Sequence, residues 1–179
     1  MQLINKIATI ALCFSICQSI ESQTNVVGKL VQSVILKNAN DKNIAIPNIG
    51  KQVVVIFYTD PDSKDVNEPL SNAIKAKNYT KEKYSSIGVG NCADTWLPNS
   101  AVRLGARQKE KEYPNSVILL DFDHVLLKSW NLNDCNDKGV IIIIGKDQKI
   151  KYISYVKSQE ESKAIIPMVL KTINEELLK

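Results

Sequence analysis

The stretch Val53-Val54-Val55-Ile56-Phe57-Tyr58 decides the fold class of this 179-residue chain. It places six consecutive apolar residues, most of them β-branched, in one run with no polar residue between them. A strand with one solvated face alternates apolar and polar residues, so an unbroken run predicts a central strand covered on both faces. A second such run occupies residues 140–144. The sequence therefore predicts a sheet enclosed between two layers.

The segments around these two runs predict strands that alternate with helices. We expect this order to give a partly parallel sheet with helices on both faces, closed by an antiparallel hairpin and a final helix. The fold class is thus α/β. The expected strands are 31–37, 43–46, 53–58, 85–90, 117–120, 140–144 and 149–156, with 125–130 following the turn 121–124. The expected helices begin near Asp65, at Ser100 behind an Asn99 N-cap, and at Ser158, the last containing Pro167.

Length and charge narrow the class of protein. The chain has the size of one domain, and 44% hydrophobic and 23% charged residues suffice for a single core. The net charge is +4, without a long block of either sign. This pattern indicates neither a nucleic-acid partner nor a membrane-surface role.

The first 22 residues have the pattern of a secretory signal. Lys6 precedes the apolar run 7–16, which is too short to span a bilayer, and polar and small residues follow. We expect cleavage between residues 18 and 24, a mature domain over 23–179, and a periplasmic or secreted protein. Lipid attachment at Cys17 and an uncleaved anchor are the alternatives.

Three stretches carry a resemblance to the thioredoxin-like superfamily, especially its exported and peroxiredoxin-related branches. They are 36–58, the expected strand pair within 117–130, and 140–148. A narrower set of residues is similar to the YtfJ-type family of small periplasmic proteins, and no activity comes with that resemblance. The set comprises Asn67, Leu70, Ala73, Ile74, Tyr113-Pro114 and Trp130-Asn131-Leu132. The resemblance implies a three-layer α/β/α domain with a mixed central sheet.

The chain departs from that superfamily where its redox chemistry takes place. Asp62-Ser63-Lys64-Asp65 stands where the redox Cys-x-x-Cys would open a helix, and Gly139 stands near the family's cis-proline. A carboxylate can neither attack a disulfide nor form one. The resemblance therefore disfavours ordinary dithiol oxidoreductase activity.

Two cysteines remain after the expected signal, Cys92 and Cys135. An oxidising compartment permits a disulfide between them, so a structural bond, a redox-switching pair and two unpaired thiols all stay open. We predict that the two are close in space without being a catalytic couple. His124 is the single histidine, and no cysteine spacing is typical of a metal site.

Polar and aromatic residues of the loops form a candidate binding edge. Asp62 and Asp65 suit helix capping or carboxylate-mediated binding, and Trp96 suits a lid on the core or a ligand contact. Arg103 and Arg107 share a helix face, which is either solvated or able to hold an anion. The edge comprises Asp62, Ser63, Asp65, Asn91, Trp96, Asn99 and Arg103.

Two hypotheses of function follow. The first is an exported, non-catalytic binding or stress-related accessory protein, without a cofactor, whose partner is another periplasmic protein or a small ligand. The second is an atypical thiol oxidoreductase or peroxidase that uses Cys92, with or without Cys135.

Overall fold

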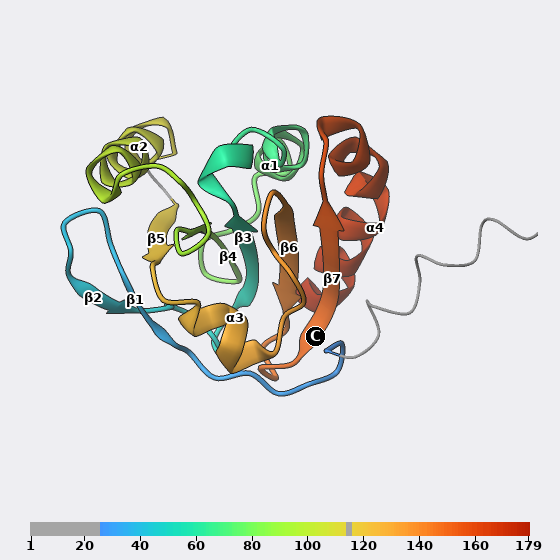
Figure 1. Cartoon of the computed structure of the whole chain (residues 1–179). Coiled ribbons are helices and arrows are strands. Elements are labelled where there is room, and N and C mark those ends of the chain that lie inside the picture. Colours follow the sequence, from blue (N-terminus) through green and yellow to red (C-terminus); the bar gives the residue numbers. More distant parts are fainter. Residues whose placement is uncertain (1–25, 114–115) are drawn as a thin grey trace, which may run out of the picture.

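Seven strands form one mixed sheet in the computed structural model, which describes residues 26–113 and 116–179 (Figure 1). The strand order across the sheet is β2-β1-β5-β4-β3-β6-β7. The strands are β1 (Ile35–Lys37), β2 (Asn43–Ala45), β3 (Val53–Thr59), β4 (Tyr84–Asn91), β5 (Val117–Asp121), β6 (Gly139–Ile144) and β7 (Ile150–Val156). The predicted signal, residues 1–22 with Cys17, lies outside the described residues.

Strand β3 lies in the interior of the sheet, between β4 and β6, as its apolar run predicts. It pairs in parallel with β4 and antiparallel with β6. Its alternate residues enter two different hydrophobic clusters: Val54, Ile56 and Tyr58 face one layer, and Val53, Val55 and Phe57 face the other. The strand is therefore buried on both sides, which explains why polar residues are missing from it.

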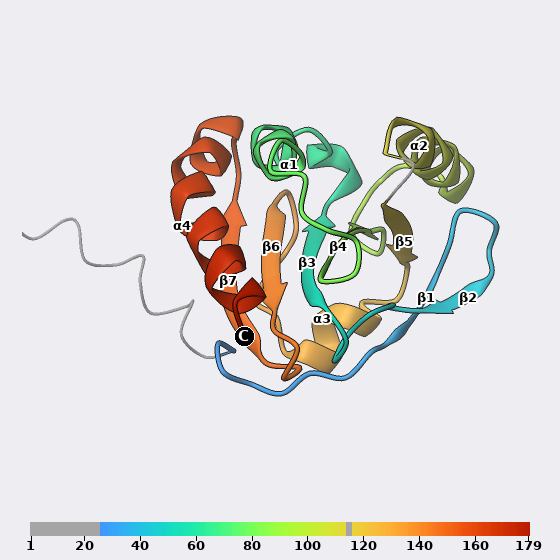
Figure 2. The same cartoon turned by 180° about the vertical axis from the view of Figure 1, so that it is seen from behind.

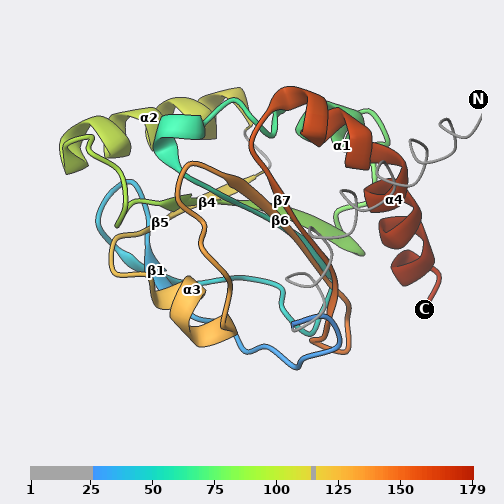
Figure 3. The same ribbon diagram turned by 45° about the vertical axis from the view of Figure 1, so that its right-hand side comes forward.

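Three helices cover one face of the sheet, and one short helix covers the other (Figures 2 and 3). Helices α1 (Glu68–Lys75), α2 (Asn99–Glu112) and α4 (Gln159–Leu177) lie on the first face. Helix α3 (Val125–Trp130) and the N-terminal segment 26–50 cover the second face and complete the larger cluster. The three-layer α/β/α prediction is confirmed.

Residues 125–130 form helix α3, so the prediction that they continue a strand pair is wrong. Two backbone N–H groups at the start of this helix, those of Val125 and Leu126, donate to the Asp121 carboxylate at 2.7 and 2.9 Å. Leu126 and Trp130 are four residues apart and share the buried face. Capping and this spacing together overcome the β-propensity of the short apolar run.

Two helix starts also differ from the sequence prediction. Helix α1 begins at Glu68, because a short 3₁₀ turn, η1 (Pro61–Ser63), precedes it, instead of a start near Asp65. Helix α2 begins at Asn99 itself, so this residue is not the N-cap; Pro98 holds that position. Pro167 lies inside α4.

The topology brings four loops to one edge of the sheet, called here the carboxyl edge. Strands β3, β4 and β5 are parallel and end there, and β6 begins there, since Thr59 pairs with Gly139. The loops are 60–67, 92–98, 122–124 and 133–138. The candidate binding residues lie on these loops, at the end of β4 or in the first turns of α2.

Candidate functional site

The loop in the redox position is organised by Asp60, a residue that the sequence reasoning missed. Its fully buried carboxylate accepts from Asp62 N at 2.9 Å and from Asp137 N at 3.0 Å. Burial raises the pKa of Asp60, and these two hydrogen bonds partly offset that rise. The Asp60-Pro61 pair, a typical turn starter, was the available signal. Asp60 thereby ties the loop after β3 to the loop before β6.

Asp62, Ser63 and Asp65 lie on the carboxyl edge, as predicted, but they do not cap a helix with their side chains. Asp62 is exposed and accepts from the Thr95 hydroxyl at 3.0 Å, which links the loops that follow β3 and β4. Asp65 is exposed and contributes its backbone oxygen to Gln159. The capping interpretation is wrong because the cap of η1 is Asp60 and the helix starts later.

A chain of polar side chains runs beneath this edge from Tyr58 to His124. The Tyr58 hydroxyl lies 3.0 Å from Asn91 Oδ1 and 3.2 Å from Asp121 Oδ2. Asn91 Nδ2 donates to Asp94 Oδ2 at 2.7 Å, and His124 Nε2 lies 2.9 Å from the same oxygen. Tyr58 is fully buried, and burial together with the Asp121 charge raises the pKa of its hydroxyl. These side chains therefore position the two loops that contain Asp94 and His124.

Two members of this chain refine the sequence prediction. Asn91 reaches the predicted edge, but its side chain is fully buried, so it holds Asp94 instead of facing a ligand. His124 adopts a left-handed backbone conformation with φ of 56°, which is uncommon for a residue with a Cβ. Partial burial raises the pKa of Asp94, but hydrogen bonds from His124 and Asn91 outweigh it and lower the pKa overall.

The two cysteines are free thiols on opposite faces of the sheet. Cys92 packs with Val102 and Leu120 under α2, whereas Cys135 joins the cluster on the α3 face. Of the alternatives left open by the sequence, the structure has two unpaired thiols, because the loops converge on one edge but approach it from different layers. Burial is the main cause that raises the pKa of each thiol to about 12. Both sulfurs donate to backbone carbonyls, those of Gly90 and Asn133.

Trp96 is a strongly exposed candidate of the edge. Its side chain is 81% exposed, so the interpretation of Trp96 as a lid on the core is wrong. Its neighbour Leu97 is half-buried and packs against the cluster beneath α2. An exposed indole held beside a structured loop is available for contact with a partner.

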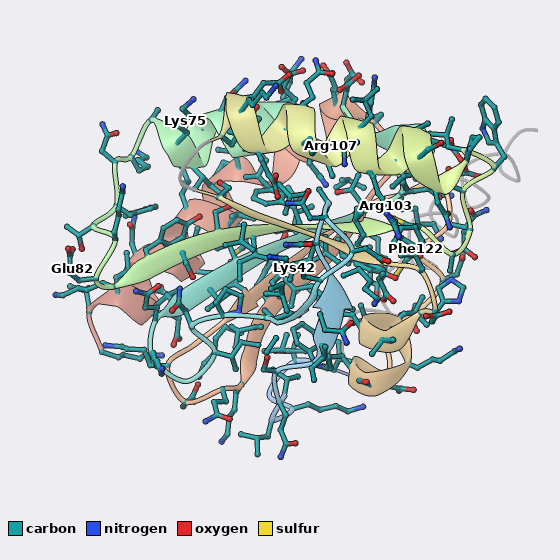
Figure 4. All side chains as sticks on the ribbon, turned by 90° about the vertical axis from the view of Figure 1, so that its left-hand side faces the viewer. Lys42, Lys75, Glu82, Arg103, Arg107 and Phe122 are labelled. Carbon is teal, nitrogen blue, oxygen red and sulfur yellow. The ribbon has the colours of Figure 1, made fainter. Side chains whose placement is uncertain are left out.

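The arginines of α2 fasten this helix to the N-terminal hairpin. Arg103 forms a 2.7 Å ion pair with Asp41 and lies 4.9 Å above the ring of Phe122, which Figure 4 shows beside it. Arg107 donates to the backbone oxygen of Ala39 at 3.0 Å. Arg107 is exposed, in agreement with the solvated-face interpretation, whereas Arg103 is half-buried. The Asp41 carboxylate accepts from Nη2 of Arg103, and Nη1 is buried without a hydrogen-bond partner among the described residues.

A groove of about 490 Å³ lies between α1 and α2, and we call it the α1–α2 groove. Its floor is β4, where Ser86, Gly88 and Gly90 face the helices. Its α2 wall is low because it contains Ala101 and Gly105. The sequence analysis missed this feature, although small residues at every second strand position and four apart on a helix were a readable signal.

The comparisons with known proteins give the family. The model of the family described as "Bacterial protein of unknown function (YtfJ_HI0045)" matches residues 30–176. The chain belongs to this family. Two relatives are an uncharacterised protein of Haemophilus influenzae, 27% identical over 109 residues, and the uncharacterised protein YtfJ of Escherichia coli, 26% identical over 92 residues. The matches cover 60% and 50% of this chain, but only 58% and 48% of those relatives.

Solved structures confirm the thioredoxin-like fold of this YtfJ-family chain. The thioredoxin domain of a thiol-disulfide oxidoreductase from Bacteroides vulgatus superposes with a TM-score of 0.56 at 15% identity, covering 83% of this chain and 98% of that domain. A peroxiredoxin-like protein from Aquifex aeolicus gives a TM-score of 0.55 at 13% identity, covering 82% and 87%. At such identities the similarity concerns the fold alone.

Within residues 26–113 and 116–179, His, Cys, Asp and Glu side chains form no group of three or more with the arrangement of a metal site. Of the helices in this part of the chain, none combines the length and hydrophobicity needed to cross a bilayer.

Proposed function

We propose that this YtfJ-family protein is an exported, non-catalytic binding protein of the periplasm, which engages another periplasmic protein or a small ligand at the carboxyl edge. One observation carries the proposal. The redox position of the fold holds Asp62 and Asp65, and both thiols are buried in separate clusters with pKa values raised to about 12. A thiol must be ionised and accessible to act as a nucleophile, so this arrangement favours binding over thiol chemistry.

The carboxyl edge supports binding because its exposed groups rest on a rigid base. Asp60, Asn91 and Asp121 are fully buried and hydrogen-bonded, and they anchor all four of its loops. Trp96 and Asp62 stand above this base in solvent. A partner therefore meets side chains that need little ordering on contact.

A test of catalysis compares the wild-type protein with Cys92→Ser in insulin reduction and peroxide consumption. We expect neither protein to exceed the uncatalysed rate. Turnover by the wild type that disappears in Cys92→Ser would overturn the proposal in favour of the thiol enzyme. A Trp96→Ala variant that captures the same periplasmic partners as the wild type would remove this edge as the binding surface.

Export is tested by intact-mass measurement on protein from its native host. We expect a chain that begins between residues 18 and 24. A full-length mass would indicate an uncleaved anchor, and a lipid-shifted mass beginning at Cys17 would indicate a lipoprotein.

A further inference from the structure

The α1–α2 groove is kept open by side chains that are smaller than those around it. On the same face of the sheet, the neighbouring strands β3 and β6 carry Val55, Phe57, Ile141 and Ile143, which α1 and α4 cover. Strand β4 carries glycine at positions 88 and 90, and both are half-buried because no helix covers them completely. Glycine inside a strand weakens the strand and often marks a place where another chain approaches.

The glycines also keep the floor low and apolar. A Cβ on Gly88 would lie 2.8 Å from Ile118 Cδ1, and one on Gly90 would lie 3.3 Å from Leu120 Cδ2. Both branched side chains of β5 therefore lie across the β4 backbone. They give the groove an apolar base beneath an opening between two helices.

The α2 wall of the groove also carries residues with little or no side chain. Ala101 and Gly105 lie on its groove face, and a Cβ at Gly105 would meet no atom within 4 Å. Glycine in an exposed helix interior is less stable than alanine by about 1 kcal/mol. Neither packing nor backbone geometry requires glycine here, since its φ is not in the left-handed region.

The shape of the groove suits an extended chain. Its α2 wall runs from Ala101 to Tyr113, which at 1.5 Å per residue is about 18 Å. An extended peptide of about five residues has this length. The groove is open along its side, so it can hold apolar side chains on its floor while the rest of the peptide remains in solvent.

The charged residues that line the groove favour a ligand with a positive charge. The lining residues include four carboxyl groups against two amines, although the whole chain has a net charge of +4. Of the four carboxyl groups, that of Asp60 is fully buried and that of Glu112 is paired with Lys109 at 3.1 Å. The exposed carboxyl groups of Asp65 and Glu68 therefore stand against the exposed amine of Lys64 at the mouth of the groove near the carboxyl edge. Leu97 lines the groove, and the exposed indole of its chain neighbour Trp96 can receive a cation on its face.

We propose that the α1–α2 groove binds an extended peptide segment of a partner protein, with a basic residue at the mouth and apolar side chains over β4. The inference rests on the proposed function, because it names the partner class of a binding protein. Nothing in it requires the cysteines.

The test uses two dye-labelled heptapeptides in fluorescence anisotropy. One has an arginine followed by alternating leucine and valine, and its counterpart has glutamate in place of the arginine. We expect the arginine peptide to bind about tenfold more tightly at low salt, and its advantage to shrink in the double variant Asp65→Asn/Glu68→Gln. Equal binding of both peptides would overturn the assignment of charge.

Gly105→Leu fills the groove, and Ser100→Leu, at an exposed position of α2 outside the groove lining, is its matched control. We expect Gly105→Leu to weaken binding of the arginine peptide at least tenfold and Ser100→Leu to leave the affinity unchanged. Thermal unfolding verifies that both variants fold; if Gly105→Leu does not, Ala101→Leu replaces it, because that position is also exposed on the same wall. Unchanged binding in the folded leucine variant would overturn the site.

The remaining outcomes separate this inference from the proposed function. Binding of hexylamine without binding of either peptide would overturn the peptide assignment. If neither peptide binds and the protein still shows no thiol or peroxide activity, the inference fails and the non-catalytic role stands.

Discussion

At the scale of single residues, Asp121 connects the sheet, helix α3 and the carboxyl edge. Its two oxygens accept from Val125 N and Leu126 N, and Oδ2 also lies 3.2 Å from the Tyr58 hydroxyl. The residue is fully buried, so no water replaces a lost bond. The strongly raised pKa of Tyr58 keeps its hydroxyl protonated and able to donate.

Substitution of Asp121 tests this connection. We expect Asp121→Ala to lower the free energy of unfolding by about 3 kcal/mol, because two buried N–H groups lose their acceptor. Asp121→Asn keeps one carbonyl oxygen, and we expect it to lose about half as much. Urea denaturation measures both. A loss below about 1 kcal/mol in the alanine variant would show that Asp121 does not hold α3.

The buried thiols make a second prediction at this scale. The folded pKa values of Cys92 and Cys135 are about 12, raised by burial from the ordinary value of 9.0. In the unfolded chain the thiols ionise first, so the unfolded state binds fewer protons above pH 9 and stability falls as the pH rises toward 12. Urea unfolding between pH 8 and 11 measures the slope, and Cys92→Ala/Cys135→Ala should flatten it. An equal slope in the double variant would contradict the assignment.

At the scale of elements, helix α3 shows where sequence patterns stop being decisive. Six residues with Val125 and Leu126 at their start fit a strand as well as a helix. The choice depends on an acceptor, the carboxylate of Asp121, that becomes available only after β5 has formed. By contrast, β3 and β6 were predictable, because a strand that is buried on both faces requires an unbroken run of apolar residues.

Helix α2 yields the third prediction. Gly105 lies inside an exposed helix face where a Cβ meets nothing. We expect Gly105→Ala to stabilise the protein by about 1 kcal/mol and to raise the Tm by about 3 °C. Differential scanning calorimetry measures the shift, and Gly88→Ala is the contrasting variant, since its Cβ would press on Ile118 at 2.8 Å. A stabilised Gly88→Ala with an unchanged Gly105→Ala would reverse the argument.

At the scale of the whole molecule, topology predicted which loops meet but not what each side chain does there. The rule that parallel strands end at one edge placed Asp62 and Trp96 on neighbouring loops and Asn91 at the end of β4. It could not assign layers, so it brought Cys92 and Cys135 together although they face opposite sides. This rule also could not predict the hydrogen bonds that link Tyr58, Asn91 and Asp94, because such contacts depend on the register across three strands.

The N-terminal segment belongs to the core of the whole molecule, and this gives the last prediction. Val26 and Val31 are 5% and 4% exposed within the cluster on the α3 face. Between them, Gly28 N donates to Ile150 O at 2.7 Å, Ile150 N donates to Lys29 O at 3.0 Å, and Val31 N donates to Gln148 O at 2.9 Å. This segment thus adds a short pairing to the start of β7.

Two truncated chains measure that contribution, one beginning at Thr24 and one at Gln32. We expect the shorter chain to be less stable by about 3–5 kcal/mol, because it loses two buried valines, while water replaces the broken backbone bonds at a smaller cost. The urea midpoints of the two chains give the difference directly. The Trp130 indole, which donates to Gln32 O at 3.0 Å, is retained in both and reports unfolding by its fluorescence. Equal midpoints would show that the core closes without residues 24–31, and that the sheet and its four helices form the complete folding unit.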